Sequence, residues 1–101
     1  MGNLVLVRFH PKEGSGPSVE QILRGMVAKT RLEPGCECYD LFHSTTDGRR
    51  IYVLLEKYRD AAALDAHRAS EHYKAYRGSI MEHLAAPIDV SILEGLDVRA
   101  V

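Results

Sequence analysis

Residues 51–76 read IYVLLEKYRDAAALDAHRASEHYKAY, and the rest of the chain is organised around them. The run 51–55 is wholly apolar, and a short run rich in Val, Ile, Leu and Tyr is typical of a strand that is covered on both faces. Asp60 and Ser70 then stand where each can cap the start of a short helix. The stretch therefore predicts one buried strand followed by two helices.

The polar side chains of this stretch predict a pocket. Glu56 stands near the end of the strand, and the helical segments after it carry His67, His72 and Tyr76. Carboxylate, imidazole and phenol groups that follow a buried strand are a usual lining of pockets in domains that mix helices and strands. We expect the remaining chain to support this pocket.

The segments on either side supply the other elements. Asp47-Gly48 between two β-type runs is a strong hairpin signal. Ser18 and Gln21 form a capping box that predicts the start of an amphipathic helix. The expected elements are strands at 4–9, 36–45, 50–58 and 88–92, a helix from residue 18 that stops at 33–35, and helices at 60–68 and from residue 70 towards 87.

The order β-α-β-β-α-β is that of the ferredoxin-like α+β fold. This fold places the first and third strands at the centre of its sheet, and here those two strands are apolar on both faces, whereas the second and fourth are mixed. Two helices cover only one face of such a sheet. We therefore expect a homodimer in which a second copy packs sheet to sheet against the other face.

The composition is that of one globular domain over residues 1–101, with 46% hydrophobic and 27% charged residues. The 13 basic and 14 acidic residues nearly cancel and are interspersed, which argues against nucleic-acid and anionic-membrane binding. The sequence shows no membrane span and no signal-like segment, so we expect a cytoplasmic protein. Cys36 and Cys38 are predicted to be reduced, partly buried thiols.

Four short motifs carry a resemblance to a known family. They are Leu32-x-Pro34-Gly35-Cys36-x-x-Tyr39, Glu56-Lys57-Tyr58, Ala63-Leu64-x-Ala66-His67 and His72-Tyr73-Lys74-Ala75-Tyr76. With them the chain resembles the antibiotic biosynthesis monooxygenase domain family over nearly its whole length, and within it the quinol monooxygenase branch. The resemblance implies a dimeric α+β barrel with a pocket in each subunit between the sheet and its helices.

The resemblance also implies an activity. Members that oxidise quinols or anthrone-like aromatic compounds are taken to use no flavin, haem or metal, so the expected cofactor is none. Dioxygen is a triplet, and a deprotonated hydroquinone or anthrone can react with it by giving up one electron first and then recombining with superoxide. The expected partners are therefore a small aromatic substrate and O2, and the protein must supply a base, hydrogen bonds and a dry cavity.

Three residues have the side chains for this catalytic task, namely Glu56, His67 and His72. Each also has a structural interpretation. Glu56 can be the polar end of a strand, His67 a hydrogen-bonded structural histidine, and His72 a solvent-facing residue in the first turn of its helix.

Three further residues are candidates for substrate binding, namely Tyr39, Tyr76 and Arg8. The tyrosines can equally be core residues whose hydroxyl groups are hydrogen-bonded. Arg8 shares a strand face with Leu4 and Leu6, where it can contact an anion or, alternatively, form a salt bridge across a dimer.

Other kinds of site find no support. His67 and His72 lack the i,i+4 spacing of a helical zinc pair and are separated by a helix break, so we expect no metal ligands. No glycine-rich Rossmann turn follows a strand. The haem-degrading branch of the family relies on a tryptophan, and this chain has none.

Three functions remain open at this point. The first is a cofactor-independent monooxygenase that acts on an electron-rich phenol, quinol or polycyclic aromatic compound. The second is an isomerase of a small oxygenated metabolite, with or without a phosphate group, since the run His72-Tyr73-Lys74 resembles that branch of the family. The third is a non-catalytic dimeric protein whose pocket only binds a ligand.

Overall fold

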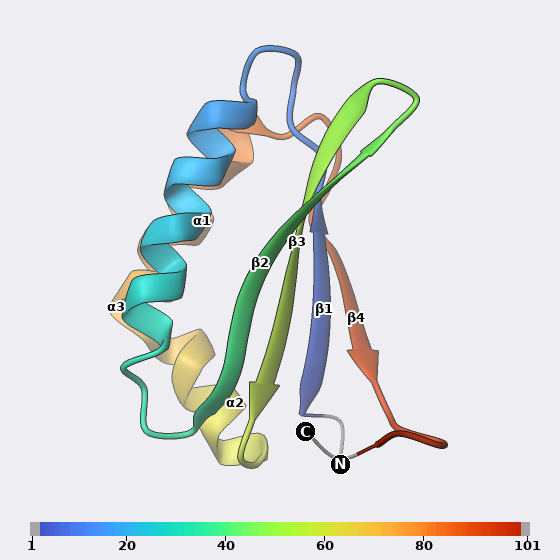
Figure 1. Ribbon diagram of the computed structural model, residues 1–101. Helices are drawn as coiled ribbons and strands as arrows, with labels where there is room; N and C mark the ends of the chain where they lie inside the picture. Colours follow the sequence, from blue (N-terminus) through green and yellow to red (C-terminus); the bar gives the residue numbers. More distant parts are fainter. Residues whose placement is uncertain (1–2, 100–101) are drawn as a thin grey trace.

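A computed structural model describes residues 3–99 of the chain, and residues 1–2 and 100–101 lie outside the described part. The elements appear in the order shown in Figure 1. They are β1 (Leu4–Phe9), α1 (Gly16–Thr30), β2 (Cys36–Thr46), β3 (Arg49–Tyr58), α2 (Ala61–Ala69), α3 (Glu71–Ile80), the 3-10 helix η1 (Met81–His83) and β4 (Asp89–Leu93).

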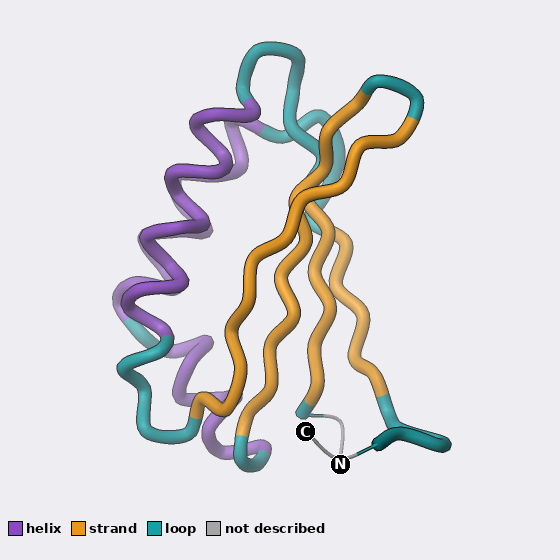
Figure 2. Tube along the Cα trace, viewed as in Figure 1, coloured by secondary structure: helices purple, strands orange, loops and turns teal. Residues whose placement is uncertain are grey.

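The four strands form one antiparallel sheet with the order β2-β3-β1-β4. The expected central position of the first and third strands is thereby confirmed. The helices lie together on one side of the sheet, and no helix of residues 3–99 lies on the opposite side (Figure 2). This is the ferredoxin-like α+β arrangement predicted from the order of elements.

Local signals in the sequence determine most element boundaries. Asp47 and Gly48 both have positive φ, 53° and 75°, as a tight two-residue hairpin turn requires. The side chain of Asp60 accepts a hydrogen bond from the amide of Ala63 (2.8 Å) at the start of α2, which confirms the predicted cap.

The predicted start of the first helix is wrong. The helix begins at Gly16, with Ser15 as its N-cap residue, so that Ser18 lies inside the first turn instead of capping it. Pro17 explains the difference, because its fixed φ favours the first turn of a helix and its missing N–H costs nothing there. The capping box of Ser18 and Gln21 is therefore not formed.

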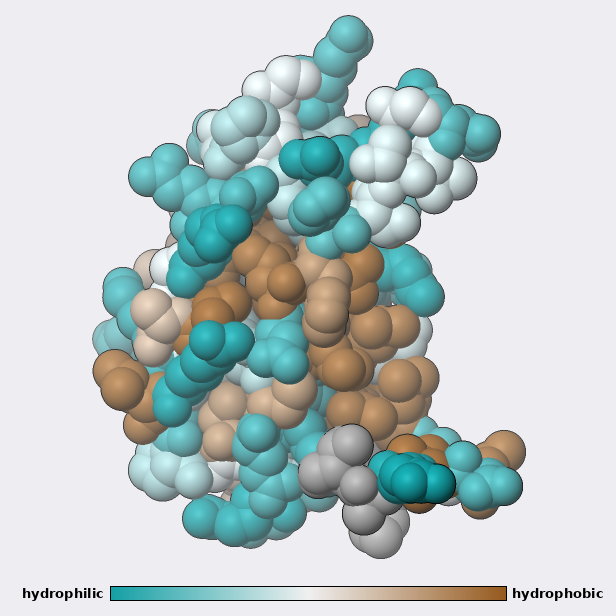
Figure 3. All heavy atoms as spheres, viewed as in Figure 1, coloured by the Kyte–Doolittle hydropathy of each residue, from teal (hydrophilic) through white to brown (hydrophobic). Residues whose placement is uncertain are grey.

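The core lies between the sheet and the helices. Alternate residues of β1 and β3 are buried beneath the helices, and the residues between them are only half-buried. Hydrophobic atoms gather over the strands, whereas the hairpin tip is hydrophilic to neutral (Figure 3). The second face of the central strands carries Leu6 and Leu55 and is not covered by any helix of residues 3–99, as the strand pattern predicted.

Two expectations from the composition can be compared with this structure. Cys36 and Cys38 are free thiols of intermediate burial, as predicted. Among residues 3–99 no helix combines the length and the apolar character that crossing a membrane would require.

Candidate active site

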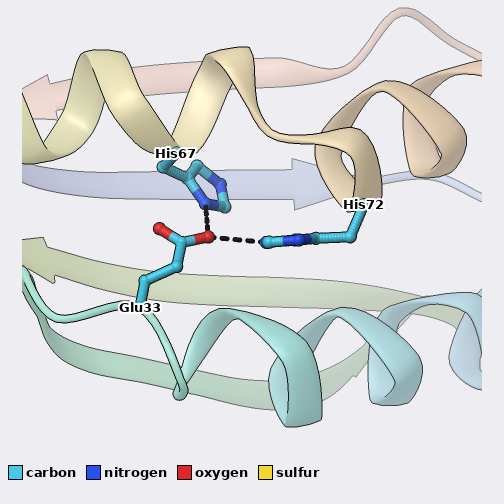
Figure 4. Close-up of side chains that lie close together, drawn as sticks. All are labelled: Glu33, His67 and His72. Carbon is cyan, nitrogen blue, oxygen red and sulfur yellow. Dashed lines mark hydrogen bonds and ion pairs between the residues drawn. The ribbon is translucent and has the colours of Figure 1, made fainter.

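Two histidines converge on one carboxylate oxygen beneath the helices. Glu33 Oε2 lies 2.9 Å from His67 Nδ1 and 2.6 Å from His72 Nε2. His67 comes from α2, His72 from the first turn of α3, and Glu33 from the loop between α1 and β2 (Figure 4). Three separate segments of the chain therefore build one polar cluster.

The loop that carries Glu33 is held by its own backbone. The amide of Glu33 donates to the carbonyl of Thr30 (2.9 Å), and its carbonyl accepts from the amide of Cys36 (3.1 Å). Gly35 is buried against α2 so closely that a Cβ at this position would lie 2.3 Å from the Cβ of Ala63. This close approach brings Glu33 within reach of the histidines of the next helices.

Ser70 joins α2 to α3 and orients the two imidazoles. Its hydroxyl donates to the carbonyl of His67 (2.6 Å) and accepts from the amide of Tyr73 (3.2 Å), which confirms the predicted cap of the second helix. The chain has an extended conformation at this residue and changes direction. The break thus lets His67 and His72 face the same carboxylate, although they do not share a helical face.

A second carboxyl group lies on the other side of the His67 ring. Glu56 of β3 faces the helices and is 6% exposed. Its Oε1 accepts a hydrogen bond from the hydroxyl of Tyr58 (2.7 Å) and lies 4.0 Å from His67 Nε2. Burial raises the pKa of Glu56 to about 7, although the Tyr58 hydrogen bond opposes that shift.

The geometry also specifies the protonation of His67. A carboxylate only accepts hydrogen bonds, so His67 Nδ1 carries the proton donated to Glu33. Burial lowers the pKa of His67, against the effect of the Glu33 carboxylate, and this favours the neutral ring. His67 Nε2 therefore presents a lone pair on the side of Glu56, which is the arrangement of a general base oriented by a carboxylate.

Aromatic rings surround this imidazole. The ring centroids of Tyr39, Tyr58 and Tyr73 lie 5.7, 5.2 and 5.1 Å from that of His67. Tyr76 is one step further away and packs against Tyr73 at 5.5 Å. Burial raises the pKa of the Tyr39 and Tyr76 phenols, so both hydroxyl groups are neutral hydrogen-bonding groups.

The structure therefore brings together five of the six residues singled out in the sequence, and Arg8 lies elsewhere. Arg8 is on the uncovered face of the sheet, where its guanidinium lies 3.9 Å from the carboxylate of Asp89. Glu33 was predicted only to lie where the first helix stops. The only signal was its place as the variable residue before Pro34-Gly35 in the family motif.

The cluster is buried on the side of His67 and partly exposed on the side of Glu33 and His72. His67 is 2% exposed, whereas the side chains of Glu33 and His72 are 17% and 20% exposed. A groove of about 430 Å³ runs between α1 and the β2-β3 hairpin, but none of its lining residues belongs to the cluster. Solvent reaches the cluster from the side of Glu33 and His72.

Comparison with known proteins shows the family. A family model described as antibiotic biosynthesis monooxygenase matches residues 4–79. The chain belongs to this family. The resemblance carried by the four sequence motifs is thereby confirmed.

Individual relatives agree with this result. A protein of Mycobacterium tuberculosis (strain ATCC 25618 / H37Rv), named "Putative monooxygenase Rv0793", is 41% identical over 93 residues, which are 92% of this chain and 90% of the relative. Its solved structure is similar with a TM-score of 0.87 and 40% identity, covering 96% of this chain and 97% of that one.

Two further similar proteins extend the comparison. "Putative monooxygenase YcnE" of Bacillus subtilis (strain 168) is 34% identical over 67 residues, 66% of this chain and 70% of the relative. A crystal structure described as an antibiotic biosynthesis monooxygenase has a TM-score of 0.83 and 32% identity, with 93% and 98% of the two chains covered. Together these relatives support a monooxygenase-like function for this family member.

Proposed function

We propose that this protein is a cofactor-independent monooxygenase that oxidises an electron-rich phenol, quinol or polycyclic aromatic compound with O2. Glu56, His67 and His72 are the proposed catalytic residues, and Tyr39 and Tyr76 are proposed to contact the substrate. The observation that carries the proposal is the His67 ring, which is held at Nδ1 by Glu33 and has Nε2 free beside Glu56.

In the proposed reaction His67 Nε2 takes the proton of a substrate hydroxyl group. The negative charge of Glu33 stabilises the imidazolium that forms, because it lies 2.9 Å from Nδ1. The buried surroundings keep water away from the phenolate, which makes it a stronger electron donor. Glu56 and His72 are proposed to accept and return protons as charge moves between the substrate and oxygen.

The oxidation balances without another reagent. The phenolate gives one electron to O2, and the resulting superoxide recombines with the substrate radical at a ring carbon that carries hydrogen. The peroxide receives a proton from His67, the ring carbon loses its own proton, and the O–O bond breaks to release water. One oxygen atom stays in the quinone product and the other leaves in that water molecule.

Access to His67 requires a movement of the chain. Because His67 and Glu56 are buried, a substrate must displace part of the cover formed by α2 and α3. Solvent already touches Glu33 and His72, so the proposed entry is on their side. Ser70, the single residue between the two helices, is the natural place for this motion.

The proposed assembly is a homodimer that packs sheet to sheet. Leu6 and Leu55 pair at the middle of the uncovered sheet face, and Phe42 on the same face is 51% exposed. Contact with a second copy would remove this apolar surface from water. Arg8 lies on the same face and is proposed either to bind an anion of the substrate or to form a salt bridge across this interface.

The proposed location is the cytoplasm, because Cys36 and Cys38 are free thiols.

The test is oxygen consumption by the metal-stripped protein over a panel of hydroquinones, naphthols and anthrones. We expect uptake above the autoxidation blank for at least one substrate, its loss in His67→Ala, and its retention in His43→Ala, whose histidine is exposed on β2. Circular dichroism shows whether each variant is folded. Wild-type rates equal to the blank on every substrate would contradict the proposal.

The burial of Glu56 and His67 also favours a second candidate, a protein that binds an aromatic ligand without turnover. Burial of Glu56 and His67 is what a purely structural hydrogen-bond network would show. The two candidates differ in one result. A ligand that raises the melting temperature of the protein while oxygen uptake stays at the blank supports binding without catalysis.

A further inference from the structure

We propose that Glu33, His67 and His72 form a binding site for one divalent transition-metal ion. The three ligand atoms, a carboxylate oxygen and two imidazole nitrogens, lie within 4.8 Å of one another. This departs from the expectation of no metal, which considered the two histidines without Glu33. It does not rest on the proposed oxidation, because it concerns binding alone.

Two of the three distances between ligand atoms are slightly shorter than those that an ion needs, and all three are within 4.8 Å. Ligand atoms about 2.0–2.2 Å from a metal are separated from each other by roughly 3.0 Å in octahedral and 3.4 Å in tetrahedral geometry. Glu33 Oε2 is 2.9 Å from His67 Nδ1 and 2.6 Å from His72 Nε2. To admit the ion, the side chains of Glu33 and His72 would rotate, and these are the two partly exposed members of the cluster.

The surroundings of His67 resemble the outer layer of a metal site. Histidines that bind a metal through one ring nitrogen usually donate the other N–H to a carboxylate. His67 Nε2 lies 4.0 Å from Glu56 Oε1, and Glu56 is itself held by the Tyr58 hydroxyl at 2.7 Å. With the ion on Nδ1, the proton moves to Nε2 and Glu56 is placed to receive its hydrogen bond.

The ligand set indicates the kind of ion. Two imidazoles and one carboxylate suit zinc, cobalt, nickel or ferrous iron, and do not suit calcium or magnesium, which prefer oxygen ligands. Three protein ligands leave at least one coordination position for water. That position lies toward the solvent-exposed side, since His67 closes the buried side and Glu33 and His72 are partly exposed.

The experiment titrates the chelator-treated full chain with Zn2+ by calorimetry and with Co2+ by visible absorption, without substrate. We expect one ion per chain. Glu33→Gln and His72→Ala should each weaken binding at least about tenfold, and Glu56→Gln by about tenfold through the outer layer. His43→Ala is the matched control and should bind as the wild type does, because His43 is exposed on β2 and outside the cluster.

The outcome separates this inference from the proposed oxidation. Absence of saturable one-to-one binding, or binding that survives both Glu33→Gln and His72→Ala, would overturn the metal site whatever the oxygen assay shows. If a variant does not fold, broadening of the His67 and His72 imidazole NMR signals of the wild type by Co2+ gives the answer. Broadening confined to His43 or His83 would also overturn it.

Discussion

The carboxylate of Glu33 lies 2.9 Å from the Nδ1 atom of His67, although 34 positions separate the two residues in the chain. This contact turns a buried, neutral histidine into an oriented one, with a defined tautomer and a free lone pair. The same oxygen accepts a hydrogen bond from His72. The chemistry of the candidate site therefore depends on a residue in the loop before β2.

Glu33→Gln tests this relationship. The amide keeps the size of the side chain but loses the negative charge that stabilises the His67 imidazolium, so oxygen uptake should fall by roughly two orders of magnitude. Glu82→Gln, an exposed carboxylate of η1, should retain the wild-type rate. Equal rates for Glu33→Gln and the wild type would show that Glu33 has no role in proton transfer.

Gly35→Ala tests how the loop is positioned. The added Cβ would lie 2.3 Å from the Cβ of Ala63, so the loop must shift, and we expect a loss of about 1–3 kcal/mol in the free energy of unfolding. Gly78→Ala is the matched control, because nothing lies within 4 Å of its added Cβ in α3. That change should leave stability unchanged or raise it by up to about 1 kcal/mol. Chemical denaturation of both variants measures the difference.

Glu56→Gln tests the buried carboxyl group through the pH dependence of stability. Burial raises the pKa of Glu56 from 4.5 to about 7, so the folded protein binds this proton more tightly than the unfolded chain. This tighter proton binding adds on the order of 3 kcal/mol to the free energy of unfolding. The contribution is fully present below about pH 4.5 and is lost as the pH rises to about 7.

The comparison of Glu56→Gln with the wild type isolates this effect from that of His67. The pKa of His67 is lowered, so its contribution changes in the opposite direction, toward greater stability as the pH rises. Relative to the wild type, Glu56→Gln should become more stable between pH 4.5 and pH 7 in urea denaturation. Glu37→Gln, which alters an exposed carboxylate, should follow the wild type. Parallel curves for Glu56→Gln and the wild type would mean that Glu56 titrates normally.

Leu55→Asp tests the proposed dimer. Leu55 pairs with Leu6 on the uncovered face of the two central strands, where a charge would be buried by a second copy. Analytical ultracentrifugation should show a dimer for the wild type and a monomer for this variant. Thr45→Asp, at the exposed end of the β2-β3 hairpin, should remain a dimer. A monomeric wild type at micromolar concentration would contradict sheet-to-sheet packing.

The fold could be predicted because its signals are local. Apolar runs, the Asp47-Gly48 turn and the caps at Asp60 and Ser70 each determine a short segment, and their order leaves one familiar arrangement. The predicted start of α1 was wrong for an equally local reason, because Pro17 favours a helix that begins before the apparent capping box.

The candidate site could be predicted only in part. The grouping could be predicted for Glu56, His67 and His72, because their side chains can exchange protons and they follow one another along the chain. The contribution of Glu33 depends on the close contact between Gly35 and Ala63, which is a property of the folded loop. Arg8 was predicted as a candidate but lies away from the cluster, because strand alternation places its side chain on the uncovered face.

We propose that the oriented His67 enables O2 to react with a phenolic substrate in the absence of a cofactor. The most direct measurement follows 18O2 into the product, using the metal-stripped wild type and His67→Ala on the best substrate of the panel. We expect one labelled oxygen atom per quinone from the wild type, at a rate that His67→Ala reduces to the autoxidation blank. Product oxygen derived from water, or equal labelled turnover by the folded variant, would contradict it.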